Sequence, residues 1–467
     1  MTDHVTPDQI DAVLAHVDAG LDTSLERLYA LLRIKSISTD PAFKVECQQA
    51  ADWIVGELKT IGFDAAAHAT EGHPVVWAKG PEQDGAHVLF YAHYDVQPVD
   101  PLHLWDSDPF EPVLKTDAQG RKIIVARGAS DDKGQMMTFI EACRAWQAVT
   151  GTLPVRISLM LEGEEESGGK NLPPFMEAHK DALSAADIAL VCDTDMWDRQ
   201  TPSITTMLRG MVGEEIEITC ANKDLHSGMF GNAARNPNQS LAEIIASLRA
   251  PDGSVTLDGF YEDVAEVSPE IKAQWASLGF DEAAYMGEAG LSIPAGEANR
   301  SVLEMLWARP TCEINGMIGG YTGDGFKTVI PAKASAKISF RLVSGMDPDK
   351  IRAAFRSHVQ AMIPADCSVR FTSHGGAPAI TVPSDGTHLQ QALNGLSSEW
   401  GKPAVITGSG GSIPVAGDFK RILGLDTLLI GFAQIDDAIH SPNEKYDLAS
   451  YHRGIRSWVR VLAALAG

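Results

Sequence analysis

No apolar run in this 467-residue sequence approaches the roughly 20 residues that a helix needs to cross a membrane. The N-terminal segment carries Asp3 and Asp11 and has no apolar core, so we expect no signal peptide. Low-complexity stretches are absent, and the composition, 44% hydrophobic and 21% charged, is that of ordinary globular proteins. The sequence therefore predicts a soluble protein without a membrane partner.

Positive charge is also scarce. The chain has 38 lysines and arginines against 62 aspartates and glutamates, which gives a formal net charge of −24. Such an excess of negative charge repels phosphate groups, which argues against a nucleic-acid partner and against an anionic membrane surface. The six cysteines are scattered without paired spacing, as expected of free thiols in a reducing compartment. We therefore predict a cytoplasmic protein.

The chain is too long for one compact core, and its hydrophobic pattern changes along its length. In the first 205 residues, amphipathic helical patterns alternate with short apolar runs at 87–92, 155–161 and 188–192. These runs are typical of buried strands in a largely parallel sheet. Apolar residues at helical spacing fill 136–146, between the first two runs. Strand, helix and strand in this order predict an open α/β fold.

The segment from 206 to 378 has a different pattern. Apolar and polar residues alternate around Ile216 and around Ile338, which predicts strands with one face exposed to water. The predicted order of elements is strand, helix, strand, strand, helix, strand. This is the split βαβ order of a ferredoxin-like α+β sandwich.

The α/β pattern resumes after this segment, with a strand at 428–432 and a final helix at 451–465. The simplest architecture is an α/β catalytic domain with an open mixed, largely parallel sheet, interrupted by the inserted sandwich. The predicted domains are residues 1–205 and 379–467 for the catalytic domain and residues 206–378 for the insertion.

Acidic and histidine-bearing segments follow the predicted strands of the catalytic domain at their C-terminal ends. Open α/β sheets bind ligands at this edge, so segments far apart in the sequence can converge there. A fifth segment, at 127–134, enters the helix around 136–146. The segments at strand ends are 93–95, 162–168, 193–195 and 436–440.

Histidines together with several carboxylates form a ligand set for zinc or a similar divalent ion. The charge balance favours two ions, because three carboxylates and a bridging hydroxide together neutralise two divalent cations. Without metal, so many buried carboxylates would repel one another and could not all stay ionised. A further glutamate beside a ligand glutamate suits a general base. Spacing alone does not decide which residue takes each role within 131–132, 164–166 and 193–195.

Four of these segments, at 91–98, 127–134, 164–168 and 440–445, resemble the motifs of the carnosinase-type co-catalytic metallopeptidases. The same family holds acetylornithine deacetylases, succinyl-diaminopimelate desuccinylases and glutamate carboxypeptidases. The resemblance runs over most of the chain, includes the inserted domain, and is closest to the cytosolic nonspecific dipeptidases. It implies that the inserted domain acts as a lid and dimerisation domain.

The resemblance implies five metal ligands, with Asp131 shared between two ions. One ion is expected to be held by His93, Asp131 and Asp193, and the other by Asp131, Glu166 and His440. We expect zinc, with manganese and cobalt as alternatives, because this ligand set tolerates several ions.

The resemblance also assigns residues that do not bind metal. Glu165 is expected to be the general base, and Asp95 is expected to orient His93. The peptide bond between Asp131 and Asp132 is expected to be cis.

Residues of the insertion and of a glycine loop complete the resemblance. His226 resembles the family's lid histidine, which reaches the active site of the partner subunit in a homodimer and stabilises the oxyanion; a simple turn cap is the alternative. Arg341 resembles the arginine that binds a substrate carboxylate, a task that suits a planar guanidinium, whereas the alternative is a solvated strand residue. Gly411 and Ser412 lie in a segment that resembles the loop beside the substrate terminus.

The predicted function is therefore cleavage of the peptide bond of dipeptides by a metal-bridged hydroxide. An aspartate at 193 favours the dipeptidase and carboxypeptidase branches of the family over the deacetylases. The alternatives are an N-acyl-amino-acid amidohydrolase (a deacetylase or desuccinylase), a small-substrate carboxypeptidase, or a binding protein that kept the fold. The complete set of ligand positions argues against the last of these.

Overall fold

The structure is a computed structural model that describes residues 5–411 and 413–467. The chain divides into two compact units. The first comprises the chain up to Thr206, Val382–Thr407 and Asp418–Gly467, and the second comprises Met207–Thr381 and Gly408–Gly417. The second unit thus covers most of the predicted insertion. It also takes in Gly408–Gly417, which the sequence analysis had placed in the catalytic domain.

The first unit is built on a mixed sheet with the strand order β1-β2-β6-β3-β7-β17-β8-β15, in which β16 also pairs with β8. The pairs β3–β6, β3–β7 and β7–β17 are parallel, as predicted for an open α/β fold. Every residue of β3 and β7 is buried, which explains why these strands are continuous apolar runs in the sequence. The strands are β1 (Asp64–His68), β2 (Val75–Lys79), β3 (His87–His93), β6 (Arg156–Glu162), β7 (Ile188–Val191), β8 (Ser203–Leu208), β15 (Ile380–Thr381), β16 (Val405–Ser409) and β17 (Thr427–Leu429).

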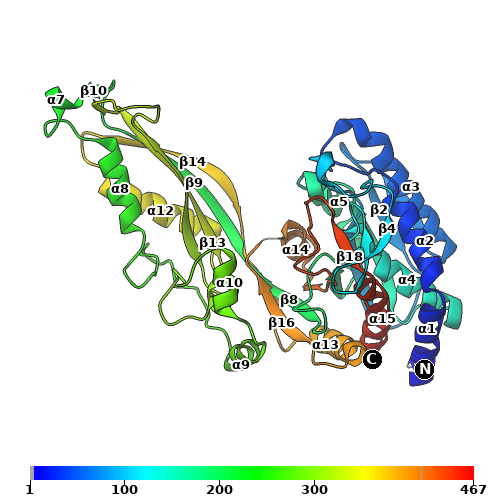
Figure 1. The fold of residues 1–467 in the computed structure, drawn as a ribbon. Coiled ribbons are helices and arrows are strands. Elements are labelled where there is room, and N and C mark those ends of the chain that lie inside the picture. The colour runs from blue at the N-terminus through cyan, green and yellow to red at the C-terminus, as the bar shows by residue number, and fades with distance from the viewer. Residues whose placement is uncertain (1–4, 412) are drawn as a thin grey trace. The chain divides into compact units, whose positions relative to one another are not determined.

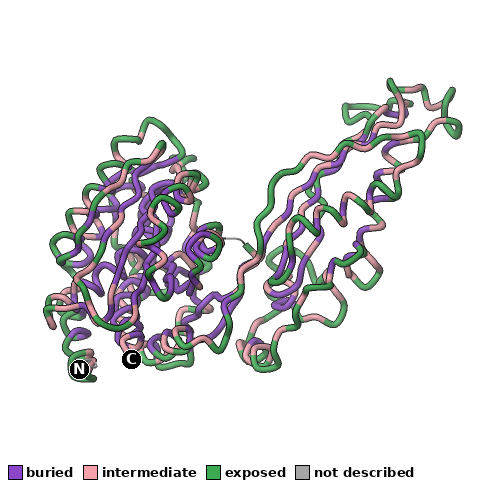
Figure 2. The backbone as a smooth tube through the Cα atoms, turned by 180° about the vertical axis from the view of Figure 1, so that it is seen from behind, coloured by how far each residue is buried: buried purple, intermediate pink, exposed green. Residues whose placement is uncertain are grey.

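Helices pack around this sheet (Figure 1). The buried residues are concentrated in the interior of the unit (Figure 2). Phe139 of α4 stacks on Phe90 of β3 with ring centroids 3.7 Å apart, and Trp458 of α15 meets Phe139 edge-on at 5.2 Å. None of the helices among the described residues is long and apolar enough to span a membrane. The helices of this unit include α1 (Pro7–Ala19), α2 (Leu21–Leu32), α3 (Lys44–Thr60), α4 (Lys133–Thr150), α5 (Leu172–Ala178), α6 (Lys180–Leu183), α13 (Thr387–Trp400) and α15 (Leu448–Leu465).

The strand predicted at 428–432 is shorter in the structure, where β17 ends at Leu429. The residues that follow are buried, but the N–H group of Phe432 donates to the side chain of Gln135 and not to a neighbouring strand. At Phe432, the side chain of Gln135 therefore takes the place of the neighbouring strand that the apolar run predicted.

A separate three-stranded sheet of the first unit has the order β18-β5-β4. β5 leads into a loop at 126–132, which we call the Asp131 loop, and β18 follows a loop at 437–444, which we call the His440 loop. β18 pairs with β5, and Lys445 lies opposite Val125. The pairing places the two loops side by side. The strands are β4 (Val113–Thr116), β5 (Lys122–Val125) and β18 (Lys445–Asp447).

The second unit contains a four-stranded antiparallel sheet with the order β11-β13-β9-β14. With α8 and α12, this is the predicted split βαβ order. Side chains of β9 alternate between buried and half-buried, because only one face of the sheet carries the helices (Figure 1). Ile216, Phe340 and Phe355 are central to the core formed there. The elements are β9 (Gly210–Thr219), α8 (Pro237–Ser247), β11 (Thr311–Gly319), β13 (Lys333–Leu342), α12 (Pro348–Met362) and β14 (Ser368–Ala377).

Shorter elements fill the remainder of the second unit. A two-stranded sheet pairs β10 with β12. The stretch between α8 and β11, for which the sequence predicted no helix or strand, contains three short helices. These elements are β10 (Leu225–His226), α7 (Ser227–Phe230), α9 (Pro269–Ser277), α10 (Glu282–Glu288), α11 (Val302–Trp307) and β12 (Val329–Ile330).

Candidate metal centre

The acidic and histidine-bearing segments converge in the first unit at the C-terminal edge of the parallel strands. His93 is the last residue of β3, and Asp193 lies just beyond the end of β7. The acidic turn that contains Glu165 and Glu166 follows β6. This is the ligand-binding edge of an open α/β sheet.

The first group of candidate ligands consists of His93 and two carboxylates, those of Asp131 and Asp193. The Nε2 atom of His93 lies 3.1 Å from Oδ1 of Asp131 and 3.9 Å from Oδ2 of Asp193. Each of the three residues offers one ligand atom, and these atoms all lie within 4.8 Å of one another. One imidazole nitrogen and two carboxylate oxygens at this spacing can hold a divalent cation.

A second group forms around His440 and shares Asp131 with the first. The Nε2 atom of His440 lies 2.8 Å from Oδ2 of Asp131 and 3.2 Å from Oε2 of Glu166. The ligand atoms of this group also lie within 4.8 Å of one another. Asp131 thus directs one carboxylate oxygen to each group, as a bridge between two cations requires.

The electrostatics of the cluster favour added positive charge. Burial raises the pKa of Asp131, but hydrogen bonds to His440 and His93 outweigh it and hold that pKa below its usual range. The same contact with Asp131, followed by that with Glu166, raises the pKa of His440 to about 10. In this cluster the imidazoles supply positive charge that two divalent cations would supply instead. Oε1 of Glu166 is buried and has no hydrogen-bond partner among the described residues, so it too is free for a cation.

Asp95 contacts both halves of the site. Its Oδ1 atom lies 3.4 Å from Nδ1 of His93, and the ring also donates to the backbone carbonyl of Asp95 at 3.1 Å. The same carboxylate accepts hydrogen bonds from the backbone amides of Glu165 (3.3 Å) and Glu166 (3.0 Å). Asp95 therefore orients the imidazole and also fixes the acidic turn, a second role that the sequence did not indicate.

Glu165 stands beside Glu166 in this turn. Burial raises the pKa of Glu165, although the neighbouring His93 opposes that rise. A raised pKa brings a carboxylate closer to the range in which it can accept and return a proton near neutral pH.

Two further residues contact the candidate metal ligands, and sequence reasoning gave neither of them this role. Gln97 donates from Nε2 to Oε2 of Glu166 at 2.6 Å. Asp132 accepts a hydrogen bond from the backbone amide of His93 at 3.1 Å, and the peptide bond between Asp131 and Asp132 is cis, as predicted. The signal for Gln97 was its position in the 91–98 segment.

The His440 loop has a strained backbone. Ala438, His440 and Asn443 have φ values of 55°, 61° and 64°, in the left-handed region. This conformation costs a residue with a side chain on the order of 1–2 kcal/mol, so other contacts must hold it.

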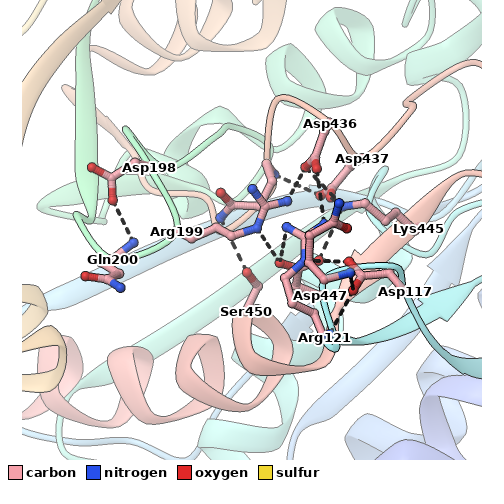
Figure 3. Close-up of polar contacts among 12 residues, drawn as sticks. Asp117, Arg121, Asp198, Arg199, Gln200, Asp436, Asp437, Lys445, Asp447 and Ser450 are labelled. Carbon is pink, nitrogen blue, oxygen red and sulfur yellow. Dashed lines mark hydrogen bonds and ion pairs between the residues drawn. The ribbon is translucent and has the colours of Figure 1, made fainter. Parts of the chain in front are cut away.

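Hydrogen bonds close the base of the His440 loop. The backbone amide of Lys445 donates to the carbonyl of Asp437 at 2.9 Å. Figure 3 shows the ammonium group of Lys445 among three carboxylates, at 3.1 Å from Asp436, 2.6 Å from Asp437 and 3.3 Å from Asp447. Arg199 pairs with Asp436 and Asp447 in the same cluster.

The other predicted site residues belong to the second unit. His226 is exposed, and its Nδ1 atom accepts the backbone amide of Gly228 at 3.0 Å, so the ring caps α7. The structure therefore contains the turn cap that was the alternative for His226. The Nε2 atom of the ring takes no part in this cap. Arg341 is half-buried on β13. Ser412 lies outside the described residues.

Arg209 contacts the glycine loop that contains Gly411, and the sequence analysis did not identify this contact. Its guanidinium donates to the carbonyl oxygens of Gly410 (3.2 Å) and Met305 (3.3 Å). Burial, together with the charge of Arg341, lowers the pKa of Arg209 to about 10. The amide of Gly411 donates to the hydroxyl of Ser409 at 3.1 Å.

Known proteins are similar to this chain in sequence and in fold. Residues 89–464 match the model of peptidase family M20/M25/M40. The Cys-Gly metallodipeptidase dug1 of Schizosaccharomyces pombe is 29% identical over 473 residues, which cover 98% of each chain. The structure of human carnosine dipeptidase 1 is 26% identical with a TM-score of 0.75 and covers 99% of this chain and 100% of that chain.

A third relative is a metallo-carboxypeptidase. The structure of the M20 family metallo-carboxypeptidase Sso-CP2 from Sulfolobus solfataricus has a TM-score of 0.78 at 29% identity, and covers 95% of this chain and 99% of that chain. The family match spans well over half of the chain and confirms the resemblance to the carnosinase-type metallopeptidases. The chain belongs to peptidase family M20/M25/M40.

Proposed function

We propose that this chain is a dipeptidase whose active site holds two divalent metal ions. The observation that carries the proposal is the pair of ligand groups that share Asp131, with Glu165 beside the second group. Relatives that match nearly the whole chain are named as dipeptidases, which supports a dipeptide substrate.

The five ligands of the proposed centre are those in the two groups. The first ion would be held by His93, Asp131 and Asp193, and the second by Asp131, Glu166 and His440. When bound, the ions would supply Lewis-acid activation of a water molecule and of the scissile carbonyl. We propose zinc, with manganese or cobalt as alternatives, because nitrogen and oxygen donors of this kind accept each of these ions.

The residues of this chain then move the protons. Glu165 accepts a proton from the attacking water and delivers it to the leaving amine, a role that its position beside Glu166 in the acidic turn supports. Asp95 keeps the ring of His93 and the acidic turn in place during this exchange, through the contacts described above.

The second unit is proposed to supply substrate recognition. Arg341 would bind the substrate carboxylate with its planar guanidinium, and Gly411 and Ser412 would line the same end of the substrate. His226 would stabilise the oxyanion in the active site of the partner subunit of a homodimer formed through this unit. His226 is exposed, and its Nε2 atom has no hydrogen-bond partner among the described residues, which supports such a role.

The six cysteines form no disulfide among the described residues, and the Sγ atoms of Cys220 and Cys367 lie 2.6 Å apart. A cytoplasmic location, where both thiols would stay reduced, is part of the proposal. The excess of acidic residues argues against a nucleic acid or an anionic membrane surface as partner.

A substrate panel tests the proposal. The protein loaded with zinc, manganese or cobalt is offered dipeptides, N-acetyl and N-succinyl amino acids, and longer peptides with a free carboxylate. We expect kcat/KM to be highest for dipeptides. A clear preference for N-acyl amino acids would identify an amidohydrolase instead. Release of C-terminal residues from longer peptides at the dipeptide rate would favour a carboxypeptidase, the candidate that the likeness to Sso-CP2 raises.

A further inference from the structure

We propose that Glu444 is a positioning residue that couples the Asp131 loop to the His440 loop and so fixes the spacing between the ligands of both metal ions. The inference rests on the proposed metal centre. It concerns a residue that neither binds metal nor reaches substrate in that proposal.

The carboxylate of Glu444 is fully buried and lies against the Asp131 loop. Its Oε1 atom accepts the backbone amides of Ser130 (2.9 Å) and Asp131 (3.0 Å). Its Oε2 atom accepts the backbone amide of Gly128 (2.9 Å) and the guanidinium of Arg127 (2.7 Å). One side chain of the His440 loop thus holds four donors of the Asp131 loop, including the amide of the bridging ligand itself.

A second link joins the same two loops. The hydroxyl of Ser130 donates to Oδ2 of Asp437 at 2.8 Å, and Asp437 also anchors the base of the His440 loop through Lys445 (Figure 3). The amide of Ala126 donates to the carbonyl of Glu444 at 3.2 Å. The loops are therefore tied at both ends of the Asp131 loop.

The backbone of the His440 loop explains why such a tie is needed. Three left-handed residues, Ala438, His440 and Asn443, lie within it, and one of them is the ligand itself. A loop in this conformation relaxes unless its surroundings hold it. Glu444 follows Asn443 directly, so its hydrogen bonds act on the loop beside the last of the strained residues.

A carboxylate suits this position better than any neutral side chain. All four of its partners are donors, and a carboxylate offers acceptor lone pairs on both oxygens. In the variant Glu444→Gln, the amide –NH2 would face two of these donors. The volume stays nearly the same, so the change breaks two of the four hydrogen bonds and nearly preserves the packing.

Glu399 provides a matched control. It is a glutamate of the same unit with a side chain only 4% exposed, and it accepts hydrogen bonds from Arg456 and Arg460. Both partners are on α15, and neither loop of the metal centre is involved. Glu399→Gln therefore reports what the loss of a buried, arginine-bound carboxylate does to stability alone.

The test measures zinc retention. Wild-type protein, Glu444→Gln and Glu399→Gln are loaded with zinc and dialysed against graded concentrations of a chelator, and bound zinc per chain is determined. We expect Glu444→Gln to lose zinc at chelator concentrations that correspond to an affinity about 10–100-fold weaker, the range found when groups that orient metal ligands are removed. Glu399→Gln should retain zinc like the wild type, even if its melting temperature falls.

Equal zinc affinity in Glu444→Gln and Glu399→Gln would overturn the inference and show that Glu444 only stabilises the fold. If Glu444→Gln does not fold, Glu444→Asp keeps the charge but shortens the reach. The same loss of zinc affinity is then expected in that variant, and its absence would overturn the inference equally. A wild-type protein that retains fewer than two zinc ions per chain without chelator would contradict the proposed metal centre itself.

Discussion

Oδ2 of Asp95 accepts a hydrogen bond of 3.0 Å from the backbone amide of Glu166. Since Asp95 also holds the ring of His93, one carboxylate fixes a proposed ligand of each metal ion. Its position thus links the end of β3 to the turn that follows β6, two segments that are neighbours only in the folded sheet.

Replacement of Asp95 should weaken metal binding through these contacts. In Asp95→Asn, the side-chain –NH2 would face an N–H donor of the His93 ring or of the acidic turn. We expect zinc affinity to fall about 10–100-fold, measured by competition with a chromophoric chelator. Asp52→Asn is a suitable control, because Asp52 is an exposed carboxylate on α3 that contacts Gln48. Unchanged zinc affinity in Asp95→Asn would contradict the orienting role.

Arg341 should discriminate substrates by their carboxylate terminus. Arg341→Lys keeps the charge but loses the planar fork that matches a carboxylate with two hydrogen bonds. We expect kcat/KM to fall at least tenfold more for dipeptides than for their C-terminal amides, an energy difference of about 1.4 kcal/mol or more. Equal losses for the two substrates would show that Arg341 is a structural residue of β13.

His226 should act in the site of the partner subunit. The variants His226→Ala and Glu165→Gln, each inactive alone, are dissociated and mixed in equal amounts. In a mixed dimer, the His226→Ala subunit keeps Glu165 and borrows His226, so one of the two sites is complete. Random pairing under two-fold symmetry then restores about a quarter of wild-type activity. A mixture as inactive as its parts would place His226 in its own subunit's site.

The stability of the metal-free protein should fall as the pH rises, because of Glu162. Burial raises the pKa of this carboxyl to about 8, although the hydrogen bond from Tyr91 opposes the rise. Below pH 4.5, the usual pKa of a glutamate, the carboxyl is protonated in both the folded and the unfolded protein, and stability is unaffected. As the pH rises from 4.5 to about 8, only the unfolded protein releases the proton, so the folded protein loses stability.

The variant Glu162→Gln cannot ionise and avoids this loss. We expect it to exceed the wild type by on the order of 5 kcal/mol in unfolding free energy at pH 9, with little difference at pH 4.5. Urea unfolding of metal-free proteins at the two pH values measures the change. A difference that does not depend on pH would show that the ionisation of Glu162 does not matter to stability.

Much of the fold could be predicted because its signals are local. Continuous apolar runs predict buried parallel strands such as β3 and β7, and alternation predicts the half-exposed strands β9 and β13. The ordered motifs placed His93 and the acidic turn at one edge of the sheet. Short elements such as β10 and β12 could not be predicted, since two residues give no period.

The roles that sequence reasoning missed depend on contacts between distant segments. Glu444 lies in the 440–445 segment that resembles a family motif, but the resemblance gave it no role, and its four donors come from a loop more than three hundred residues earlier. The second contact of Asp95, with the acidic turn, likewise exists only in the folded sheet. No local pattern distinguishes such a carboxylate from one that is solvated at the surface.

The variant Glu165→Gln tests the central proposal most directly, because it separates metal binding from proton transfer. If Glu165 is the general base, the variant keeps two metal ions per chain, and kcat for dipeptides falls about 10²–10⁴-fold. Metal content by atomic spectroscopy and turnover are measured on the same sample. Loss of half of the metal with turnover largely retained would instead make Glu165 a ligand and contradict the proposed centre.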